Sequence, residues 1–316
     1  MSTITADEAV ADTTAEVDLG VALNAAFEGR HHERRAAGRA AYPTDGMHRD
    51  PSLGLAEARQ WTLERLKVLV DHGFGQAIQP AESADEATLV QSLIDFETIS
   101  HGDLSVAIKS GVQHGLFGGA IASLGNDDQH DRFLGGALSL EVLGCFAMTE
   151  RGHGSDVQSL ETTITFDPEA GDFVVHSPKE SSAKTYIGNA AAHGHMAAVF
   201  GQLIVDGTEH GVHCILVPIR DDDGSVHEGV TIGDNGHKGG LIGVDNGWIS
   251  FDHVRVGRDL LLDRFGSVNA DGQYESSIEN PNRRFFSMLG ALVRGRICIG
   301  GGAAFASRPA LSIATF

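Results

Sequence analysis

The hydrophobic periodicity of this chain changes near Gly144, and this change constrains the fold more than any other feature. Up to about Leu143 apolar residues recur at the spacing of an amphipathic helix, and beyond Gly144 they alternate as in a half-buried strand. After about Ile278 helical spacing returns. One type of element cannot satisfy both periods, because they place side chains on faces of different geometry. We therefore predict an α+β protein with helices first, strands second and a helix last.

The first helical part contains three predicted helices. Ser83 and Glu86 have the spacing of a capping box, apolar residues at helical spacing follow them, and Gly102 is a suitable stop. A second amphipathic pattern runs from residue 55 to residue 73. Asn126 can cap a third helix.

The middle part consists of short apolar segments separated by polar turns. Leu160–Phe166 and Phe173–His176 flank a segment dense in turn formers, which indicates a β-hairpin. Further predicted strands are Met196–Val205, Val212–Pro218, Val230–Ile232 and Trp248–Val256. Short strands at this spacing predict a compact antiparallel barrel or sandwich.

The last part, from Arg284 to Ile313, is predicted to be helical. Its run of small residues, 300–304, lets a helix pack closely against neighbours, and we expect those neighbours to lie outside this sequence. Pro309 falls inside this helix, where proline costs about 3 kcal/mol or more.

These patterns divide the chain into four parts. Residues 1–20 are polar and are predicted to form a mobile tail. Residues 21–143 should form an N-terminal α-helical domain, 144–275 a central β domain, and 276–316 the first, incomplete part of a C-terminal helical domain.

Composition argues against several classes of protein. The 43 acidic and 23 basic side chains give a formal charge of −20 without a basic stripe, which argues against nucleic-acid binding. The three cysteines are far apart, which argues against a disulfide scaffold or a thiolate metal site. The acidic N-terminus does not resemble a signal peptide, and we find no apolar run of transmembrane length. We expect a soluble, cytoplasmic protein with no membrane partner.

Clusters of histidine and glycine suggest two further kinds of site. His31-His32-Glu33 and His193-Gly194-His195 lack the spacing and carboxylate partner of a zinc hydrolase, so no metal site is predicted. Gly239-Gly240 and the glycines at 300–302 do not open a helix after a strand within a βαβ unit. A dinucleotide-binding fold is therefore not expected.

The stretch Cys145–Asp156, CFAMTERGHGSD, is the first candidate ligand site. A predicted strand ends there in a loop that contains Gly152 and Gly154 and the hydroxyls of Thr149 and Ser155. Such a loop lets a flat or anionic ligand approach the backbone. A turn that binds nothing explains the same residues equally well.

The second candidate is Lys184–Ala190, KTYIGNA, on a predicted neighbouring strand. The ring of Tyr186 could lie against a planar cofactor, and Gly188 would let the backbone approach that cofactor. An ordinary core tyrosine is the alternative. The presence of both candidates in one β domain favours the ligand interpretation.

The two candidate segments resemble the acyl-CoA oxidase branch of the acyl-CoA dehydrogenase family. Three later segments carry the same resemblance: HCILVPIRD, VTIGDNGHKGGLIGVDNGWISFDHVRV and the arginine-bearing helix after them. The resemblance extends from the N-terminal helices to the last residue. Its densest motifs are Cys145–Pro178 and Gly233–Val256. The histidine within Glu150–Gly154 is typical of the oxidases.

The resemblance implies a fold and an activity. It implies an N-terminal helical domain, a central antiparallel β-barrel and a C-terminal helical bundle that together bind FAD. The implied enzyme removes two hydrogens from the α and β carbons of a fatty acyl-CoA, gives trans-2-enoyl-CoA, and passes the electrons to O2 to form H2O2. A homodimer is implied for the full-length protein.

The resemblance also implies site residues. Thr149 is placed at the flavin ring, Ser155 is implied in both cofactor and acyl-CoA binding, and Arg294 or Arg296 in substrate binding. The implied cofactor-binding residues are Phe146, Met148, Thr149, Gly154, Ser155, Tyr186, Ile187 and Gly188. The family's catalytic glutamate would lie beyond this sequence, so no catalytic residue is assigned.

Two alternatives for the function and one for the location remain open. The chain could belong to a dehydrogenase that passes electrons to a carrier flavoprotein, or be a non-catalytic acyl-CoA-binding fragment. A peroxisomal location is the alternative to the cytoplasm for a full-length eukaryotic protein. Candidate cations for the phosphates of FAD and CoA are Arg151, Lys184, Lys238, Arg294 and Arg296.

Overall fold

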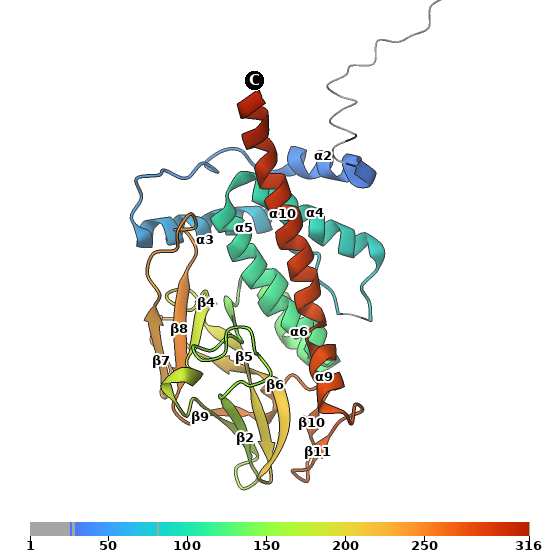
Figure 1. Cartoon of the computed structure of the whole chain (residues 1–316), viewed down its shortest axis with the longest axis vertical. Helices are drawn as coiled ribbons and strands as arrows, with labels where there is room; N and C mark the ends of the chain where they lie inside the picture. Colours follow the sequence, from blue (N-terminus) through green and yellow to red (C-terminus); the bar gives the residue numbers. More distant parts are fainter. Residues whose placement is uncertain (1–25, 27–28, 81, 316) are drawn as a thin grey trace, which may run out of the picture.

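The computed structural model describes residues 26, 29–80 and 82–315, so the tail predicted at residues 1–20 lies outside the described residues. Helices gather at one end of the molecule and sheets at the other (Figure 1). The last helix runs alongside the helical part (Figure 1). The predicted order of helices, strands and helix is confirmed.

The N-terminal helices follow the predicted pattern. The main α-helices are α2 (His32–Ala41), α3 (Leu55–Asp71), α4 (Glu86–Gly102), α5 (Leu104–Ser110) and α6 (Gly119–Leu124), with the short α7 (Asp127–Gln129) and α8 (Gly135–Leu138) after them. Helix α4 is capped by Asp85, whose Oδ1 accepts a bond from the N–H of Thr88 at 2.7 Å, and not by Ser83. Asn126 forms the predicted cap, in a reciprocal pair of bonds with Gln129.

Between α5 and α6 the helix widens. Segment η2 (Gly111–Gly118) is π-helical and continues directly from α5 into α6. A second π-helical turn, η3 (His130–Leu134), joins α7 to α8. Such segments are uncommon and are found frequently at functional sites.

The β part contains two main sheets. The larger has the order β1-β5-β2-β3-β9, with β6 also paired to β5, and the smaller has the order β4-β8-β7. The strands are β1 (Gly144–Ala147), β2 (Thr163–Asp167), β3 (Asp172–His176), β4 (Lys184–Gly188), β5 (Met196–Val205), β6 (Thr208–Pro218), β7 (Val230–Asp234), β8 (Asn246–Phe251) and β9 (Val254–Gly257). Strands β10 (Ser267–Val268) and β11 (Tyr274–Glu275) pair separately.

The prediction of a purely antiparallel barrel is wrong in one respect. Strand β5 is parallel to β1 over its first half and parallel to β2 over its second half, while β6 pairs along its other edge. A strand has only two edges, so β1 and β2 share one of them. Periodicity fixes which face of a strand is buried but not which strand pairs with it, and this arrangement was therefore beyond the sequence pattern.

The segment predicted as one strand, Trp248–Val256, is two strands in different sheets. Strand β8 pairs with β4 and β7, whereas β9 pairs with β3. The chain crosses between the sheets at Asp252-His253, and His253 has a φ of +53°. Apolar and polar residues alternate on both sides of this crossing, so the sequence pattern does not show where one strand ends and the next begins.

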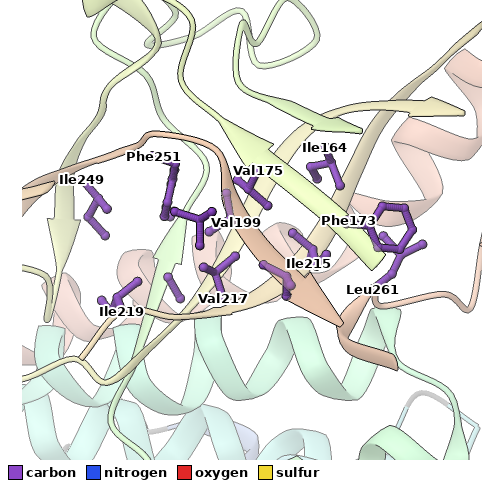
Figure 2. Close-up of a cluster of buried hydrophobic side chains, with 14 of the residues drawn as sticks. Ile164, Phe173, Val175, Val199, Ile215, Val217, Ile219, Ile249, Phe251 and Leu261 are labelled. Carbon is purple, nitrogen blue, oxygen red and sulfur yellow. The ribbon is translucent and has the colours of Figure 1, made fainter. Parts of the chain in front are cut away.

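The two sheets enclose one apolar core (Figure 2). Ile164, Val175 and Val217 of the larger sheet face Ile249 and Phe251 of the smaller one across it. The other face of β5 and β6 packs on the helices, where a second apolar cluster includes Phe117, Ile121, Ala198, Phe200 and Leu216. Strands buried on both faces read as continuous apolar runs, as β5 does.

The C-terminal helices are α9 (Pro281–Met288) and α10 (Gly290–Thr315). The expectation that α10 has no partner here is wrong in part, because it packs against α4 and η2 (Figure 1). Val293 and Ile297 on its other side are more than half exposed. The helix continues through Pro309.

Among the described residues, one helical stretch, Pro281–Arg308, which comprises α9 and most of α10, is long and apolar enough to cross a membrane. The sequence pattern did not reveal it, because arginines divide its apolar residues. The same length and composition occur in core helices of soluble proteins, and α10 contacts α4.

Candidate functional site

The two candidate ligand segments lie side by side. Backbone N–H groups of Arg151 and Gly152 donate to the carbonyls of Ala183 and Ser181 at 2.9 and 2.8 Å. The N–H of Thr185 donates to the carbonyl of Thr149 at 3.0 Å. The glycine-rich loop after β1 is therefore held directly against the start of β4.

Alternation along β1 sends its side chains to two places. Cys145 and Ala147 point into the core between the sheets, while Met148 and Phe146 face the helical side. The ring of Phe146 packs on Phe200, with centroids 4.8 Å apart. The strand thus presents one apolar face toward η2.

A bulge in β4 turns Tyr186 outward. The register with β8 shifts between Lys184 and Ile187, and Tyr186 has a φ of +55°, a left-handed conformation uncommon for a tyrosine. Its side chain is 70% exposed while its neighbours are buried. Tyr186 is therefore not the ordinary core tyrosine of the alternative interpretation.

All eight predicted cofactor-binding residues line one groove of about 520 Å³. The predicted Arg296 lines it as well, and the groove lies between the β part, η2 and α10. Its full lining is Ile108, Val112, Leu116, Phe146, Met148, Thr149, Gly154, Ser155, Val157, Tyr186, Ile187, Gly188, Lys238, Val244, Asn246, Leu292 and Arg296. None of these described lining residues carries a carboxylate.

Two glycines shape the groove. A Cβ added to Gly154 would meet no protein atom within 4 Å, so it would extend into open space. A Cβ added to Gly188 would lie 2.6 Å from a methyl carbon of Val112. Gly188 is therefore needed for β4 to approach η2, and Gly154 leaves open space beside the loop.

Lys184, predicted as a candidate cation for a phosphate, has a structural role. Its Nζ is fully buried, 2.9 Å from Oε1 of Glu150, and donates to the carbonyls of Met148 and Phe200. Burial lowers the pKa of Lys184 to about 8. Glu150 also accepts from the backbone N–H and hydroxyl of Thr162 at 2.9 and 2.6 Å. Neither Lys184 nor Glu150 lines the groove. Their ion pair instead holds the glycine-rich loop on β4.

The other candidate cations differ in their surroundings. Arg151 is exposed and pairs with Glu180. Lys238 lines the groove, and its Nζ lies 6.0 Å from the centroid of the Tyr186 ring. Arg296 is exposed and lines the groove, and Arg294 lines a neighbouring cavity.

That second cavity, of about 500 Å³, lies between α4, η2 and α10. It shares Ile108, Val112, Leu116, Leu292 and Arg296 with the groove, so the two spaces adjoin. Its other lining residues are Gly75, Ile78, Ser92, Asp95, Phe96, Ile99, Ser110, Gly111, His114, Gly115, Arg294, Gly295, Cys298 and Ile299. Burial lowers the pKa of Arg294.

A buried polar network behind the groove was missed by the sequence analysis. Lys109 Nζ donates to Oδ1 of Asn189 at 2.6 Å and lies 3.0 Å from Nδ1 of His193. Asp245 accepts from the backbone N–H of His193 at 2.8 Å. Burial is the main reason that the pKa of His193 falls to about 4, so the ring is neutral and accepts from Lys109. A lysine within an apolar helical pattern was the available signal.

The described residues also bring together two groups of possible metal ligands, and neither is a cluster that the sequence suggested. One contains Glu150, which is already paired with Lys184. The other contains His176, Asp252 and His253. The two imidazole rings are stacked 3.8 Å apart at 25°, so their in-plane lone pairs do not converge on one ion.

Comparisons with known proteins show which family this chain resembles. Residues 145–254 match the family model described as acyl-CoA dehydrogenase, middle domain. The chain is 41% identical over 260 residues to acyl-coenzyme A oxidase 3, peroxisomal, of Arabidopsis thaliana, a match covering 82% of this chain and 38% of the relative. It is 45% identical over 218 residues to an acyl-coenzyme A oxidase-like protein of Mus musculus, covering 69% of this chain and 34% of that protein.

Solved structures give the same result. The fold matches acyl-CoA oxidase 1 of Yarrowia lipolytica with a TM-score of 0.76 and 30% identity, covering 89% of this chain and 39% of that one. It matches acyl-CoA oxidase 1 of Caenorhabditis elegans, solved in complex with FAD and ATP, with a TM-score of 0.64 and 28% identity over 78% of this chain and 37% of that one. The chain thus spans less than half the length of these proteins. By sequence and by fold, the chain belongs to the acyl-CoA dehydrogenase and oxidase family.

Proposed function

We propose that this chain forms the flavin- and acyl-binding part of an FAD-dependent acyl-CoA oxidase. The reaction takes a fatty acyl-CoA and O2 to trans-2-enoyl-CoA and H2O2. The observation that carries the proposal is the single groove in which all eight predicted cofactor residues meet. The names of the similar proteins, which are acyl-CoA oxidases, support the same reaction.

The groove suits the planar ring system of FAD. Phe146 and Met148 give it an apolar wall, and Thr149 offers a hydroxyl at the end of β1. Gly154 leaves room where any other side chain would protrude. When bound, FAD supplies the electron acceptor that no side chain provides.

The adjoining cavity suits the acyl chain. Much of its wall is aliphatic or aromatic, with Ile78, Phe96 and Ile99 on one side and Ile108 and Leu116 on another. The shared boundary at Arg296 places a cation where the two spaces meet, suited to the anionic groups of FAD or CoA.

The described residues that line the groove provide no carboxylate base. Removal of the α proton of a thioester requires such a base. We therefore assign no catalytic residue within this chain. A homodimer of the full-length protein remains part of the proposal.

Location follows the names of the relatives. The expectation of a cytoplasmic protein finds no support among them, because the Arabidopsis proteins are named as peroxisomal. We propose the peroxisomal alternative for a full-length eukaryotic protein. Fluorescence of a reporter fused to the complete reading frame tests it, and a diffuse cytoplasmic signal would contradict it.

The test of the function begins with flavin. The purified chain, incubated with FAD and desalted, should keep flavin absorbance, and a saturated acyl-CoA should perturb its spectrum. Chemically reduced flavin in the protein should then be reoxidised rapidly in air with release of peroxide. Slow reoxidation would favour the dehydrogenase alternative, and failure to retain flavin while binding acyl-CoA would favour the non-catalytic binding fragment.

A further inference from the structure

A single carboxylate, that of Asp95, lies among the described residues lining the groove and the cavity. Asp95 belongs to α4 and is 5% exposed. Its Oδ1 accepts from Nε2 of Gln91 at 2.7 Å, and its Oδ2 accepts from the N–H of Gly75 at 3.3 Å. The proposed reaction gives this buried acid no task.

Other polar groups gather beside Asp95. A Cβ on Gly75 would lie 2.5 Å from Nδ1 of His114, so the imidazole is directly against this glycine. Nδ1 of His114 lies 3.1 Å from the hydroxyl of Ser110, and Nε2 lies 3.3 Å from the carbonyl of Leu138. The cavity therefore has a polar end, formed by Gly75, Asp95 and His114, within a largely apolar wall.

The carboxylate of Asp95 can accept more hydrogen bonds than the described residues donate to it. A carboxylate has about four lone-pair sites, and two donors reach Asp95 from the described residues. Burial raises the pKa of Asp95 against the opposing effect of these two bonds. The pKa of His114 falls to about 4 through burial, so it is neutral and places no positive charge beside the acid.

An unsubstituted alkyl chain that reached this end would cover the free acceptor sites with methylene groups, which is unfavourable for a buried polar group. A hydroxyl on the chain would instead donate to them.

We propose that the cavity selects acyl chains bearing a hydrogen-bond donor, such as a hydroxyl group, and that Asp95 is the specificity-determining residue that accepts this bond. This inference rests on the proposed function, since it requires the cavity to hold the acyl chain. The chemical class of ligand is a hydroxyacyl-CoA.

The experiment compares matched ligands. The FAD-loaded chain is titrated calorimetrically with dodecanoyl-CoA and with its mid-chain and ω-hydroxy derivatives. We expect one hydroxylated ester to bind about tenfold more tightly than dodecanoyl-CoA. Asp95→Leu should abolish or reverse that preference. Glu86→Leu, which removes an exposed acid from the same helix outside the cavity, should keep it.

The possible results distinguish a wrong assignment of Asp95 from a wrong proposed function. Equal binding of all esters by the unaltered chain, or a preference that survives Asp95→Leu, would overturn the assignment of Asp95. Absence of binding by every ester would count against the proposed function itself. Should Asp95→Leu fail to fold by circular dichroism, Asp95→Asn takes its place, because it keeps the shape and replaces one acceptor by a donor. A preference unchanged in Asp95→Asn would also overturn the assignment.

Discussion

Gly188 lies where β4 meets η2 beside the groove. Gly188→Ala places a Cβ within 2.6 Å of Val112, so the strand or the helix must shift. We expect lower flavin content and a loss of about 1–3 kcal/mol in unfolding free energy, typical of overpacking. Flavin absorbance after desalting and urea denaturation measure the two effects.

The matched control for Gly188→Ala is a substitution at Val112, because the added Cβ would contact that side chain. Val112→Ala combined with Gly188→Ala removes the two methyl groups in conflict and should recover part of both losses. Gly154→Ala should be stable, because its Cβ meets no protein atom, yet should bind flavin less well. Full flavin content in both single variants would contradict the placement of FAD in this groove.

The buried pair of Lys184 and Glu150 holds the glycine-rich loop. Lys184→Met leaves the carboxylate of Glu150 buried without its cation, and removing one partner of such a pair costs about 3–5 kcal/mol. We expect that loss in urea denaturation. Lys184→Met with Glu150→Gln should be less destabilised than Lys184→Met alone. Equal stability of the single and double variants would show that the pair is not coupled.

At the scale of elements, Lys109 joins α5 to the turn after β4. It bonds Asn189, which has a φ of +67° and directly follows Gly188, and it approaches His193 in the same turn. Lys109→Met should leave the side-chain Oδ1 of Asn189 without this donor, which costs about 1–3 kcal/mol, and should weaken FAD binding. Lys67→Met, on the exposed side of α3, is the control. Unchanged FAD affinity in Lys109→Met would show that the contact between Lys109 and Asn189 does not contribute to FAD binding.

At the scale of the whole molecule, stability should fall as pH falls. His114, His193 and His213 lie in separate places, and burial is the largest cause lowering the pKa of each to about 4. The unfolded chain takes up protons near pH 6.5, whereas the folded chain resists until about pH 4. Unfolding is therefore increasingly favoured between those two values. Between about pH 7 and about pH 5 each histidine accounts for about 2 kcal/mol.

His213 isolates one of these contributions. His213→Asn keeps a donor for the carbonyl of Gly211 but does not titrate. Between about pH 7 and about pH 5, the unfolding free energy of this variant should therefore fall by about 2 kcal/mol less than that of the unaltered chain. Urea denaturation at the two pH values gives the slope. An equal slope in His213→Asn and in His72→Asn, which changes an exposed histidine, would refute the assignment.

The groove without a carboxylate leads to an expectation for the molecule as a whole. The chain of 316 residues should retain flavin but should not convert acyl-CoA to enoyl-CoA, since the described groove residues supply no base. Absorbance of enoyl-CoA and release of peroxide are the measurements. Turnover would contradict the expectation. Asp95 would then be the first residue to replace, because Glu150 is occupied by Lys184.

The sequence by itself determined the elements and the local ligand motifs. Period and capping residues placed α3, α4, β3 and β5 within a few residues of their observed bounds, because both signals are local. The resemblance selected eight of the residues that line the groove. Glycine and hydroxyl residues at a strand end carry that information without any distant partner.

Only the tertiary structure decided the pairings between distant segments. The parallel alignment of β1 and β2 on one edge of β5, the use of Lys184 for Glu150, and the link from Lys109 to Asn189 each join residues far apart along the chain. Local patterns specify which face of an element is buried, whereas the partner on that face depends on how all elements pack. The polar end of the cavity at Asp95 arises in the same way, because α4, η2 and the loop at Gly75 meet only in the folded molecule.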